Sequence, residues 1–447
     1  MSDAEARNRL AAAVPPNVRT VCETLAAAGY QAVAVGGAVR DAILGRTPGD
    51  WDIATSAHPA QVMALFKHTV PTGLAHGTIT IVTGRGEHTH VEVTTFRGEG
   101  AYTDARRPDH VTFGVPLVED LARRDLRVNA IAYDPAAGTL IDPYDGQNDI
   151  AEKRLRAVGP TGNVYDDAVA RFTEDGLRVM RAVRFAAALE FALDPDTERG
   201  IAPALPSLAK VSKERVSDEL RKILATRQPS RALAIAERTQ ILALILPELM
   251  LGIEAWAAAL HVERPTAVAR WLARVDAAAP IARLGALVAE LAEPDPTLRR
   301  LDRGSQRGVE RVLRRLKFSN DESAAAAVLA GAAAAPLATG WTDAEIRRLL
   351  ADVTRPHAPA AVALWRADQA IELADRAAAI LARKDALAVG ELAVTGKDLM
   401  VALEMQPGPG VGRLLAALLD RVLIDPALNT RDQLIAISRG LELELVR

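Results

Sequence analysis

The chain has 447 residues and a formal net charge of −3, so it exceeds one compact core and does not have the strongly basic balance of many nucleic-acid binders. Its single cysteine, Cys22, excludes an intrachain disulfide and fits a reducing compartment. No run of about 18 uncharged apolar residues predicts a membrane span, and the charged residues 1–13 do not predict a signal peptide. We therefore expect a cytoplasmic protein of several domains.

The first predicted strand, Gln31–Val35, leads directly into a glycine pair, Gly36 and Gly37. Ala38–Leu44 then has the pattern of a short helix. A glycine pair at such a turn lets backbone N–H groups approach a phosphate with no Cβ in the way, and the helix N-terminus adds partial positive charge. A glycine pair alone is usually only a turn, so this signal needs support from its neighbours.

The next predicted strand carries two carboxylates, Asp50 and Asp52. The strand period of two places both on one face, with Trp51 and Ile53 on the other. Two carboxylates on one face suit Mg²⁺, which prefers hard oxygen ligands and keeps waters for substrate phosphates. An isolated Asp-x-Asp is usually a solvated strand edge, but here it follows the glycine turn closely. This order predicts nucleotide chemistry.

A third carboxylate is expected, because two metal ions about 4 Å apart need bridging ligands. Glu92 is the candidate, since alternation along the predicted strand His90–Phe96 puts it on the face opposite Val91 and Val93. A single Glu on a strand is by default a surface residue, so this assignment depends on the rest of the pattern.

Predicted strands concentrate in the first third of the chain, and helical periodicity dominates after about residue 165. The strands are Gln31–Val35, Trp51–Ala54, Thr78–Thr83, His90–Phe96, Val128–Tyr133 and Thr139–Ile141. The helical stretches include Val169–Leu189, Ser212–Ala225, Ser230–Leu244, Thr266–Val275 and Pro359–Leu381. The pattern predicts a mixed α/β head followed by an all-helical remainder.

Two arginine-rich segments add candidate nucleotide-binding groups. In Arg123–Ala130 the arginines suit triphosphate oxygens, because a guanidinium stays charged and offers paired donors, and Asp125 is placed to accept from a ribose hydroxyl. In the predicted helix Val169–Leu189 a polar ridge recurs every three residues: Asp175, Arg178, Arg181 and Arg184. The alternatives are a helix-terminal ion pair in the first segment and surface salt bridges in the second.

The block Gly-Gly-x-x-Arg-Asp-x-x-x-Gly-x-x-x-x-Asp-x-Asp over residues 36–52 resembles the signature of polymerase-β-like nucleotidyltransferases. Arg123–Ala130, Glu174–Arg178 and Ser212–Val216 resemble further blocks of the class II CCA-adding enzymes (tRNA nucleotidyltransferases) and the related bacterial poly(A) polymerases. Leu126–Val128 depart from the family pattern. The resemblance implies a multidomain, mostly helical protein: an α/β polymerase-β-like head (1–157), then an all-α neck (158–228), body (229–295) and tRNA-binding tail (296–447).

The resemblance also implies roles for the candidate residues. The catalytic, Mg²⁺-binding carboxylates would be Asp50, Asp52 and Glu92. The nucleotide would be bound by Gly36, Gly37, Arg40, Arg124, Asp125, Asn129, Asp175, Arg178, Arg181 and Arg184. The implied reaction is template-independent addition of CCA to the 3′ end of tRNA from CTP and ATP, with release of pyrophosphate.

In this family an Asp and an Arg select the base, which assigns that role to Asp175 and Arg178. Cytosine and adenine each present an amino donor beside a ring-nitrogen acceptor, so a carboxylate and a guanidinium complement both. Uracil and guanine present a carbonyl beside a ring N–H, and each protein group would then face its like, at about 1–3 kcal/mol per mispaired buried group. Gly176, between the two residues, is expected to add local looseness.

Three alternatives remain open from the sequence. The chemistry is shared with bacterial poly(A) polymerases and with enzymes that add only part of CCA, although a loop at Gly98–Phe113 resembles one that accompanies A addition. A non-catalytic RNA-binding protein is the alternative of another class. The segment Arg299–Lys317, with eight Lys/Arg against Asp302 and Glu310, is either a phosphate-contacting surface or a solvated helix face.

Overall fold

The computed structural model describes residues 2–84, 89–99, 111–294 and 300–445. The chain divides into two compact units, of which unit 1 comprises Met1–Thr226 and Arg231–Ile245, and unit 2 comprises Arg227–Ser230 and Leu246–Arg447. Residues 100–110 of the predicted Gly98–Phe113 loop, and Arg299 of the basic segment, lie outside the described residues. None of the helices that the structure describes is long and apolar enough to cross a membrane.

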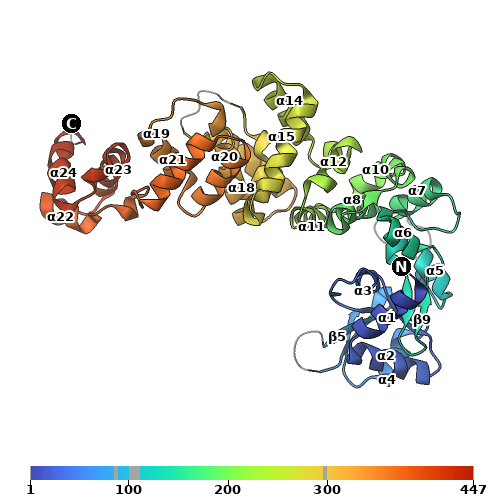
Figure 1. Cartoon of the computed structure of the whole chain (residues 1–447). Helices are drawn as coiled ribbons and strands as arrows, with labels where there is room; N and C mark the ends of the chain where they lie inside the picture. Colours follow the sequence, from blue (N-terminus) through green and yellow to red (C-terminus); the bar gives the residue numbers. More distant parts are fainter. Residues whose placement is uncertain (1, 85–88, 100–110, 295–299, 446–447) are drawn as a thin grey trace. The chain divides into compact units, whose positions relative to one another are not determined.

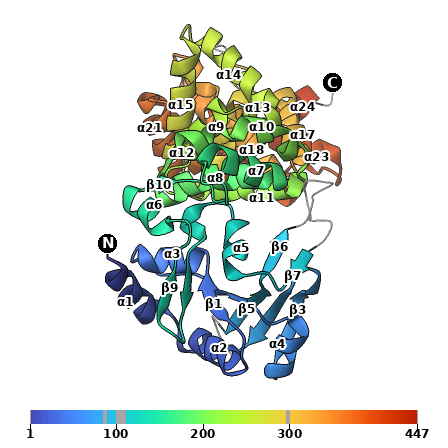
Figure 2. The ribbon, with the colours of Figure 1, turned by 90° about the vertical axis from the view of Figure 1, so that its right-hand side faces the viewer.

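The head of unit 1 is built on a seven-stranded mixed sheet (Figure 2). Its strands, in spatial order, are β3 (Thr69–Gly73), β4 (Thr78–Val82), β5 (His90–Thr95), β2 (Asp52–Thr55), β1 (Ala32–Val35), β8 (Ala132–Asp134) and β9 (Thr139–Ile141). Strand β5 alternates as predicted, with Val91 and Val93 buried and Glu92 exposed. All four residues of β1 are buried, which explains why it is a continuous apolar run.

Helices cover the sheet and form the head core. Helix α2 (Pro16–Ala27) packs on β1 and β2, and α4 (Pro59–Leu65) packs on β4. Val33 and Val35 of β1 belong to one buried cluster with Leu117 and Leu121 of α5 (Leu117–Ala122). The α/β head predicted from the sequence is therefore confirmed.

The structure differs from the predicted strands in one wrong prediction and in several strands that the sequence did not predict. Val128–Tyr133 is not one strand: residues Arg127–Asn129 form a 3₁₀ turn, and only Ala132–Asp134 pair as β8. Strand β3 was missed because it lies at the sheet edge, is largely exposed and contains Pro71, so it lacks the alternation of a half-buried strand. Four short strands were also not predicted: β6 (Arg97–Glu99), β7 (Val111–Phe113), β10 (Arg154–Leu155) and β11 (Ala192–Leu193).

Helices make up the rest of unit 1. They are α1 (Asp3–Ala13), α3 (Gly37–Ile43), α6 (Gly146–Glu152), α7 (Val164–Glu174), α8 (Leu177–Leu189), α9 (Pro195–Arg199), α10 (Ile201–Lys210), α11 (Lys213–Leu224), α12 (Ser230–Arg238) and α13 (Ile241–Ile245). Helix α10 contacts α7, and α11 contacts α8. In Figure 1, α1 and α3 lie in the head, whereas α7, α8 and α10 to α12 follow it along the chain.

The predicted helix Val169–Leu189 is in fact two helices, α7 and α8, which are separated at Asp175 and Gly176. Asp175 has extended backbone angles (φ −132°, ψ 103°), and its side chain accepts a hydrogen bond from Leu177 N at 3.0 Å. The expected looseness at Gly176 is wrong, since a Cβ there would lie 2.3 Å from Leu208 N of α10. Gly176 is required because two backbones approach closely.

Within the residues that the structure describes, unit 2 contains helices and no strand (Figure 1). Its longer helices are α14 (Pro247–Ala259), α15 (Arg264–Ala277), α16 (Arg283–Leu287), α17 (Arg303–Arg315), α18 (Asn320–Ala332), α19 (Asp343–Val353), α20 (Ala358–Ala367), α21 (Ile371–Ala382), α22 (Gly396–Leu403), α23 (Pro409–Ile424) and α24 (Arg431–Leu445). This confirms the predicted helical remainder, although the stretch Pro359–Leu381 is split between α20 and α21.

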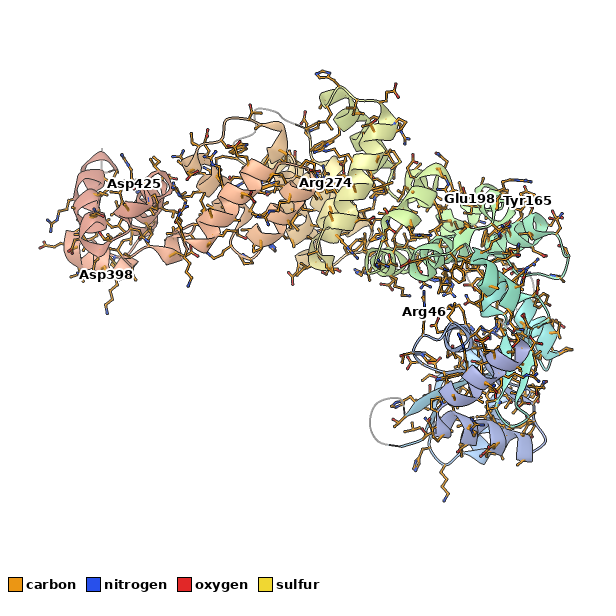
Figure 3. All side chains as sticks on the ribbon, in the orientation of Figure 1. Arg46, Tyr165, Glu198, Arg274, Asp398 and Asp425 are labelled. Carbon is orange, nitrogen blue, oxygen red and sulfur yellow. The ribbon has the colours of Figure 1, made fainter. Side chains whose placement is uncertain are left out.

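The core of unit 2 includes a fully buried arginine, Arg274, which is labelled in Figure 3. Its guanidinium donates to Asp368 at 2.9 Å and to Glu290 at 2.6 Å. Trp256 lies beneath this guanidinium, at 5.3 Å from ring centroid to Arg274 Cζ. Because a buried charge is tolerated only when it is paired, these contacts fix how α15 packs in the unit.

Candidate active site

A cavity of about 420 Å³ in unit 1 brings most of the predicted site residues together. It is lined by Gly36, Gly37, Arg40, Asp52, Arg123, Arg124, Asp125, Asn129, Asp175, Leu177, Arg178, Arg181, Phe185 and Arg215. Three predicted residues, Asp50, Glu92 and Arg184, do not belong to the lining. The lining is mostly polar and rich in arginine, as a site for an anionic ligand requires.

The glycine turn forms one wall of the cavity. Gly36 has φ +79° and ψ −138°, a backbone conformation that L side chains rarely adopt. A Cβ at Gly36 would lie 3.0 Å from Arg124 Nη1 and 4.0 Å from Asp52 Oδ2. Glycine is therefore required here, because a Cβ would enter the space between a guanidinium and a carboxylate, and the predicted contact of this turn with a phosphate stays a prediction.

Asp52 and Glu92 are paired by the strand register. Strands β2 and β5 run parallel, and Asp52 is the register partner of Glu92. Asp50 lies in a bend before β2, which begins at Asp52, so the strand period does not extend to Asp50 as predicted. The surrounding protein desolvates the Asp52 carboxylate, and this raises its pKa. Arg124 opposes the rise, whereas the charges of Glu92 and Asp50 add to it.

These three carboxylates have the donor chemistry of a divalent-cation site. Carboxylate oxygens are the ligands that Mg²⁺ prefers, and a cation would offset the desolvation and the repulsion that together raise the pKa of Asp52. Within the described residues, no three acidic, His or Cys side chains converge closely enough to form a complete site by themselves. The donor chemistry of Asp52 and Glu92 suits a divalent cation, but Asp50 does not complete a three-ligand group with them.

A buried polar network joins the glycine turn to α8. Arg40 Nη1 donates to Asn129 Oδ1 at 2.6 Å, and Asn129 Nδ2 donates to Asp125 Oδ1 at 2.9 Å. Asp125 also accepts from Leu126 N and, through Oδ2, from the Arg181 guanidinium at 2.8 and 2.7 Å. Burial alone would raise the pKa of Asp125, but Arg181 and Asn129 hold it well below its usual range.

These contacts occupy the acceptor positions of the Asp125 carboxylate with protein donors. The predicted ribose contact of Asp125 remains a prediction, and it requires a ribose hydroxyl to share or displace one of these donors. What the structure adds is that Asp125 and Asn129 connect Arg40, after the glycine turn, to Arg181 on α8.

Phe185, which the sequence did not single out, is surrounded by three guanidinium groups. The Cζ atoms of Arg40, Arg181 and Arg184 lie 5.2, 5.5 and 4.2 Å from its ring centroid. Arg184 also donates to Glu219 of α11 at 2.7 Å, outside the cavity lining. Arg184 is therefore placed to orient α8 against α11.

The C-terminal end of α8 is held from the head. Arg46, labelled in Figure 3, donates to the carbonyl oxygens of Ala188 at 3.2 Å and Leu189 at 3.4 Å. A positive charge at a helix C-terminus satisfies free carbonyls and complements the helix dipole. Both ends of α8 are thus fixed by residues outside it.

The two predicted base-reading residues both face the cavity. Asp175 accepts from Leu177 N and from Arg215 Nη2, the latter at 2.9 Å. Arg178 donates to Glu174 Oε2 at 2.9 Å and is 8% exposed. The predicted ridge therefore begins at Arg178, because Asp175 lies before the helix and not on it.

Two charged cavity residues, Arg123 and Arg215, were not among the predicted site residues. Arg123 adjoins the predicted Arg124, whereas Arg215 belongs to Ser212–Val216, a segment in which the sequence predicted no site residue. Nothing in the local spacing links it to Asp175, because 40 positions separate them. The contact arises only from the packing of α11 against α8.

Comparison with protein families gives three matches. Residues 32–156 match the model "Poly A polymerase head domain", and residues 190–251 match "Probable RNA and SrmB- binding site of polymerase A". Residues 302–437 match "tRNA nucleotidyltransferase domain 2 putative".

Similar curated proteins are named CCA-adding enzyme. The one from Lactiplantibacillus plantarum is 37% identical over 435 residues, which cover 94% of this chain and 95% of that protein. The one from Leuconostoc mesenteroides is 47% identical over 216 residues, or 48% of this chain and 51% of that protein. For the latter relative and the similar enzyme of Geobacillus thermodenitrificans, the match spans about half of the relative's length.

Solved structures agree with the fold. The Bacillus stearothermophilus CCA-adding enzyme in complex with CTP superposes with a TM-score of 0.69 at 32% identity, covering 96% of this chain and 99% of that chain. The Thermotoga maritima CCA-adding enzyme complexed with tRNA superposes with a TM-score of 0.65 at 18% identity, covering 97% of both chains, a likeness of fold. With a relative that is 37% identical over nearly its whole length, this chain belongs to the CCA-adding enzyme family of tRNA nucleotidyltransferases.

Proposed function

We propose that the protein adds CCA to the 3′ end of tRNA from CTP and ATP, without a nucleic-acid template, and releases pyrophosphate. The observation that carries this proposal is that one cavity is lined by the glycine turn, by Asp52 and by the base-reading residues Asp175 and Arg178. A site for the triphosphate and a site for the base are thereby parts of the same space. The names of the similar proteins support the same reaction.

The metal in this proposal is Mg²⁺, held by Asp50, Asp52 and Glu92. Family members of this kind use divalent metal ions, and the all-oxygen donor set suits Mg²⁺ in particular. When bound, the ion would make the 3′-hydroxyl group of the tRNA more acidic and would neutralise negative charge on the triphosphate. Asp50 has to approach the pair Asp52–Glu92 for all three to share an ion.

The chain's own residues bind and orient the reactants. The Gly36–Gly37 backbone with Arg40 and Arg124 holds the triphosphate, so that the tRNA 3′-hydroxyl attacks the α-phosphorus in line with the departing group. The new bond joins the 3′-oxygen to the α-phosphorus, and the bond from the α-phosphorus to the bridging oxygen breaks to release pyrophosphate. Arg181 and Arg184 contact the phosphates or orient α8, and Asn129 positions Arg40.

Base selection in this proposal follows from fixed hydrogen-bonding groups. Asp175 accepts a hydrogen bond from the amino group of cytosine or adenine, and Arg178 donates one to the neighbouring ring nitrogen. With uracil or guanine the same groups would be mispaired, at about 1–3 kcal/mol for each buried group. Asp125 contributes the preference for a ribonucleotide through the ribose hydroxyl.

The substrate tRNA would be bound through its 3′ end in the head (1–157) and neck (158–228), and through its acceptor and elbow region by the body (229–295) and tail (296–447). The basic helix α17 supports this assignment of the tail. We also place the reaction in the cytoplasm, because the only cysteine, Cys22, is a buried free thiol that suits a reducing compartment.

The test is a primer-extension gel with purified protein, Mg²⁺ and tRNA transcripts that end at the discriminator base, at C or at CC. Each nucleoside triphosphate is supplied singly, and CTP is also supplied together with ATP. We expect addition of C, C and A that then stops, on tRNA and not on an unrelated RNA. Long A tails on any RNA would instead identify a poly(A) polymerase, and addition that stops after CC would identify a partial enzyme. No extension would leave an RNA-binding protein.

A further inference from the structure

The break between α7 and α8 is held rigidly from two other helices. On one side, Gly176 lies against the backbone of α10, where an added Cβ would be 2.3 Å from Leu208 N and 2.4 Å from Ser207 C. On the other side, Arg215 of α11 donates to Asp175. The residue that would read the base therefore sits in a turn whose position is fixed by two neighbouring helices.

The Asp175 carboxylate is constrained at both oxygens. Its Oδ1 accepts from Leu177 N at 3.0 Å, and its Oδ2 accepts from Arg215 Nη2 at 2.9 Å. A carboxylate held at both oxygens is not free to rotate about its terminal torsion, so its remaining acceptor positions point in one direction. Arg215 lines the same cavity as Asp175.

Arg215 is one of several contacts of α11. Helix α11 is also joined to α8 by an ion pair between Arg184 and Glu219 at 2.7 Å, and Lys222 donates to the same Glu219 at 2.9 Å. The side chains of Val216 and Leu220 of α11 are buried. The contact between Arg215 and Asp175 differs from these in that it holds a carboxylate that lines the cavity.

We propose that Arg215 is a positioning residue for base selection, which fixes the Asp175 carboxylate in the orientation that accepts the amino group of cytosine or adenine. This inference rests on the proposed function. Without Arg215, the Asp175 carboxylate can rotate. A small rotation would then move its oxygens away from the carbonyl group of uracil or guanine and lower the cost of binding the wrong base. Loss of Arg215 should therefore lower the ratio of kcat/KM between correct and incorrect nucleotides more than it lowers kcat/KM for the correct nucleotide.

The experiment compares single-nucleotide addition of CTP and UTP, and of ATP and GTP, by wild type and Arg215→Gln. We expect the ratio of kcat/KM for CTP over UTP to fall about tenfold or more, which corresponds to about 1.4 kcal/mol. Arg215→Lys keeps a charged donor and should restore part of the ratio. The matched control is Arg221→Gln, which removes an exposed ion pair with Asp218 from the same helix.

A double-mutant cycle tests whether Arg215 acts through Asp175. In an Asp175→Ala background, Arg215→Gln should cause no further loss of discrimination between nucleotides, because both changes remove the same interaction. An equal loss in that background would overturn the proposal by showing that Arg215 reads the base itself. Equal slowing of all four nucleotides, with ratios unchanged, would overturn it too.

These outcomes are separable from failure of the proposed function. If wild type extends no RNA, the function fails and no ratio exists to compare. If wild type adds CCA and Arg215→Gln discriminates as well as wild type, only the present inference fails. Should Arg215→Gln not fold, as judged by circular dichroism, the ratio measured for Arg215→Lys against Arg221→Gln decides the question.

Discussion

Three acidic residues bring negative charges close together in the part of the head where metal binding is proposed. Asp52 and Glu92 are register partners on parallel strands, and together with Asp50 and desolvation they raise the pKa of Asp52 despite Arg124 nearby. This arrangement disfavours the ionised form of the Asp52 carboxylate in the folded protein, so packing alone does not explain why the three carboxylates lie near one another. It is explained if the carboxylates share a cation during turnover.

Replacing Asp52 with Asn tests this explanation. We expect nucleotide addition to fall by more than about 100-fold, since loss of groups that merely support metal ligands typically reduces affinity or activity about 10–100-fold. The free energy of unfolding should not fall, because the substitution removes one of the repelling charges. Mg²⁺-dependent extension and urea unfolding measure the two effects.

Asp166→Asn, an exposed carboxylate outside the cavity lining, is the control for this substitution. Near-normal turnover by Asp52→Asn would rule out a metal-binding role for Asp52. A large loss of stability would show that Asp52 serves the fold.

Local periodicity was sufficient to predict some site residues and insufficient for others. The glycine turn, the face of Asp52 and the face of Glu92 follow from spacing within one or two elements, and the cavity or the register agrees with them. Arg215 and Phe185 reach the cavity only because α8 packs against α11 and the head. That packing is not encoded in any local pattern.

At the scale of elements, the instructive difference is the interruption at Asp175. The apolar spacing of residues 169–189 fits one continuous helix, because α7 and α8 each keep a buried face. The side chain of Asp175 competes with the helix by accepting from Leu177 N, which caps α8. A single Asp-Gly pair thus outweighs the periodicity around it and places the carboxylate in the cavity.

Gly176→Ala should disrupt this junction. A methyl group 2.3 Å from Leu208 N meets backbone, which cannot move aside as a flexible side chain could. We expect a loss of about 1–3 kcal/mol in unfolding free energy, the usual effect of overpacking, together with reduced nucleotide addition. Urea unfolding and the extension assay measure the two effects.

The matched control for Gly176→Ala is Gly308→Ala, in α17, where an added Cβ meets nothing within 4 Å. That change should be neutral or should stabilise by up to about 1 kcal/mol, because alanine favours the helix. Equal effects of the two substitutions would contradict the close contact at Gly176.

At the scale of the whole molecule, the sequence predicted the class of fold but not its topology. The seven-stranded sheet ends at Ile141, and the long helices begin with α7 at Val164, close to the predicted change at about residue 165; only the short strand β11 follows it among the described strands. The order of the seven strands, with β5 between β4 and β2, requires long-range pairing that alternation does not specify. It is this order that makes Asp52 and Glu92 register partners.

The single cysteine reports on the integrity of unit 1. Cys22 is fully buried on α2, and burial raises the pKa of its thiol to about 12. We expect almost no reaction with a thiol reagent at pH 8 in the native protein, because little thiolate exists and access is closed. Labelling should begin only with the urea concentration that unfolds unit 1. Rapid labelling of native protein, at a rate near that in 6 M urea, would contradict this packing.

The basic helix α17 bears on how unit 2 engages a large substrate. Arg303, Arg307 and Arg311 recur at intervals of four along it and are exposed, which places them on one face. Replacing the three with Gln should weaken binding of full-length tRNA. For every lost phosphate contact, the slope of log K against log salt should become shallower by about 0.7–0.9. The rate of addition at saturating tRNA should stay the same, because the chemistry is proposed for unit 1.

Arg300→Gln is the control for these substitutions, since Arg300 lies in the same basic segment but is paired with Asp352 at 2.6 Å. Binding titrations at several salt concentrations distinguish the two interpretations of this helix. Unchanged affinity and slope in the triple variant would make it a solvated helix face. A reduced slope would make it a surface that contacts the tRNA backbone, and would extend the substrate's contacts beyond the cavity in which we propose that the reaction takes place.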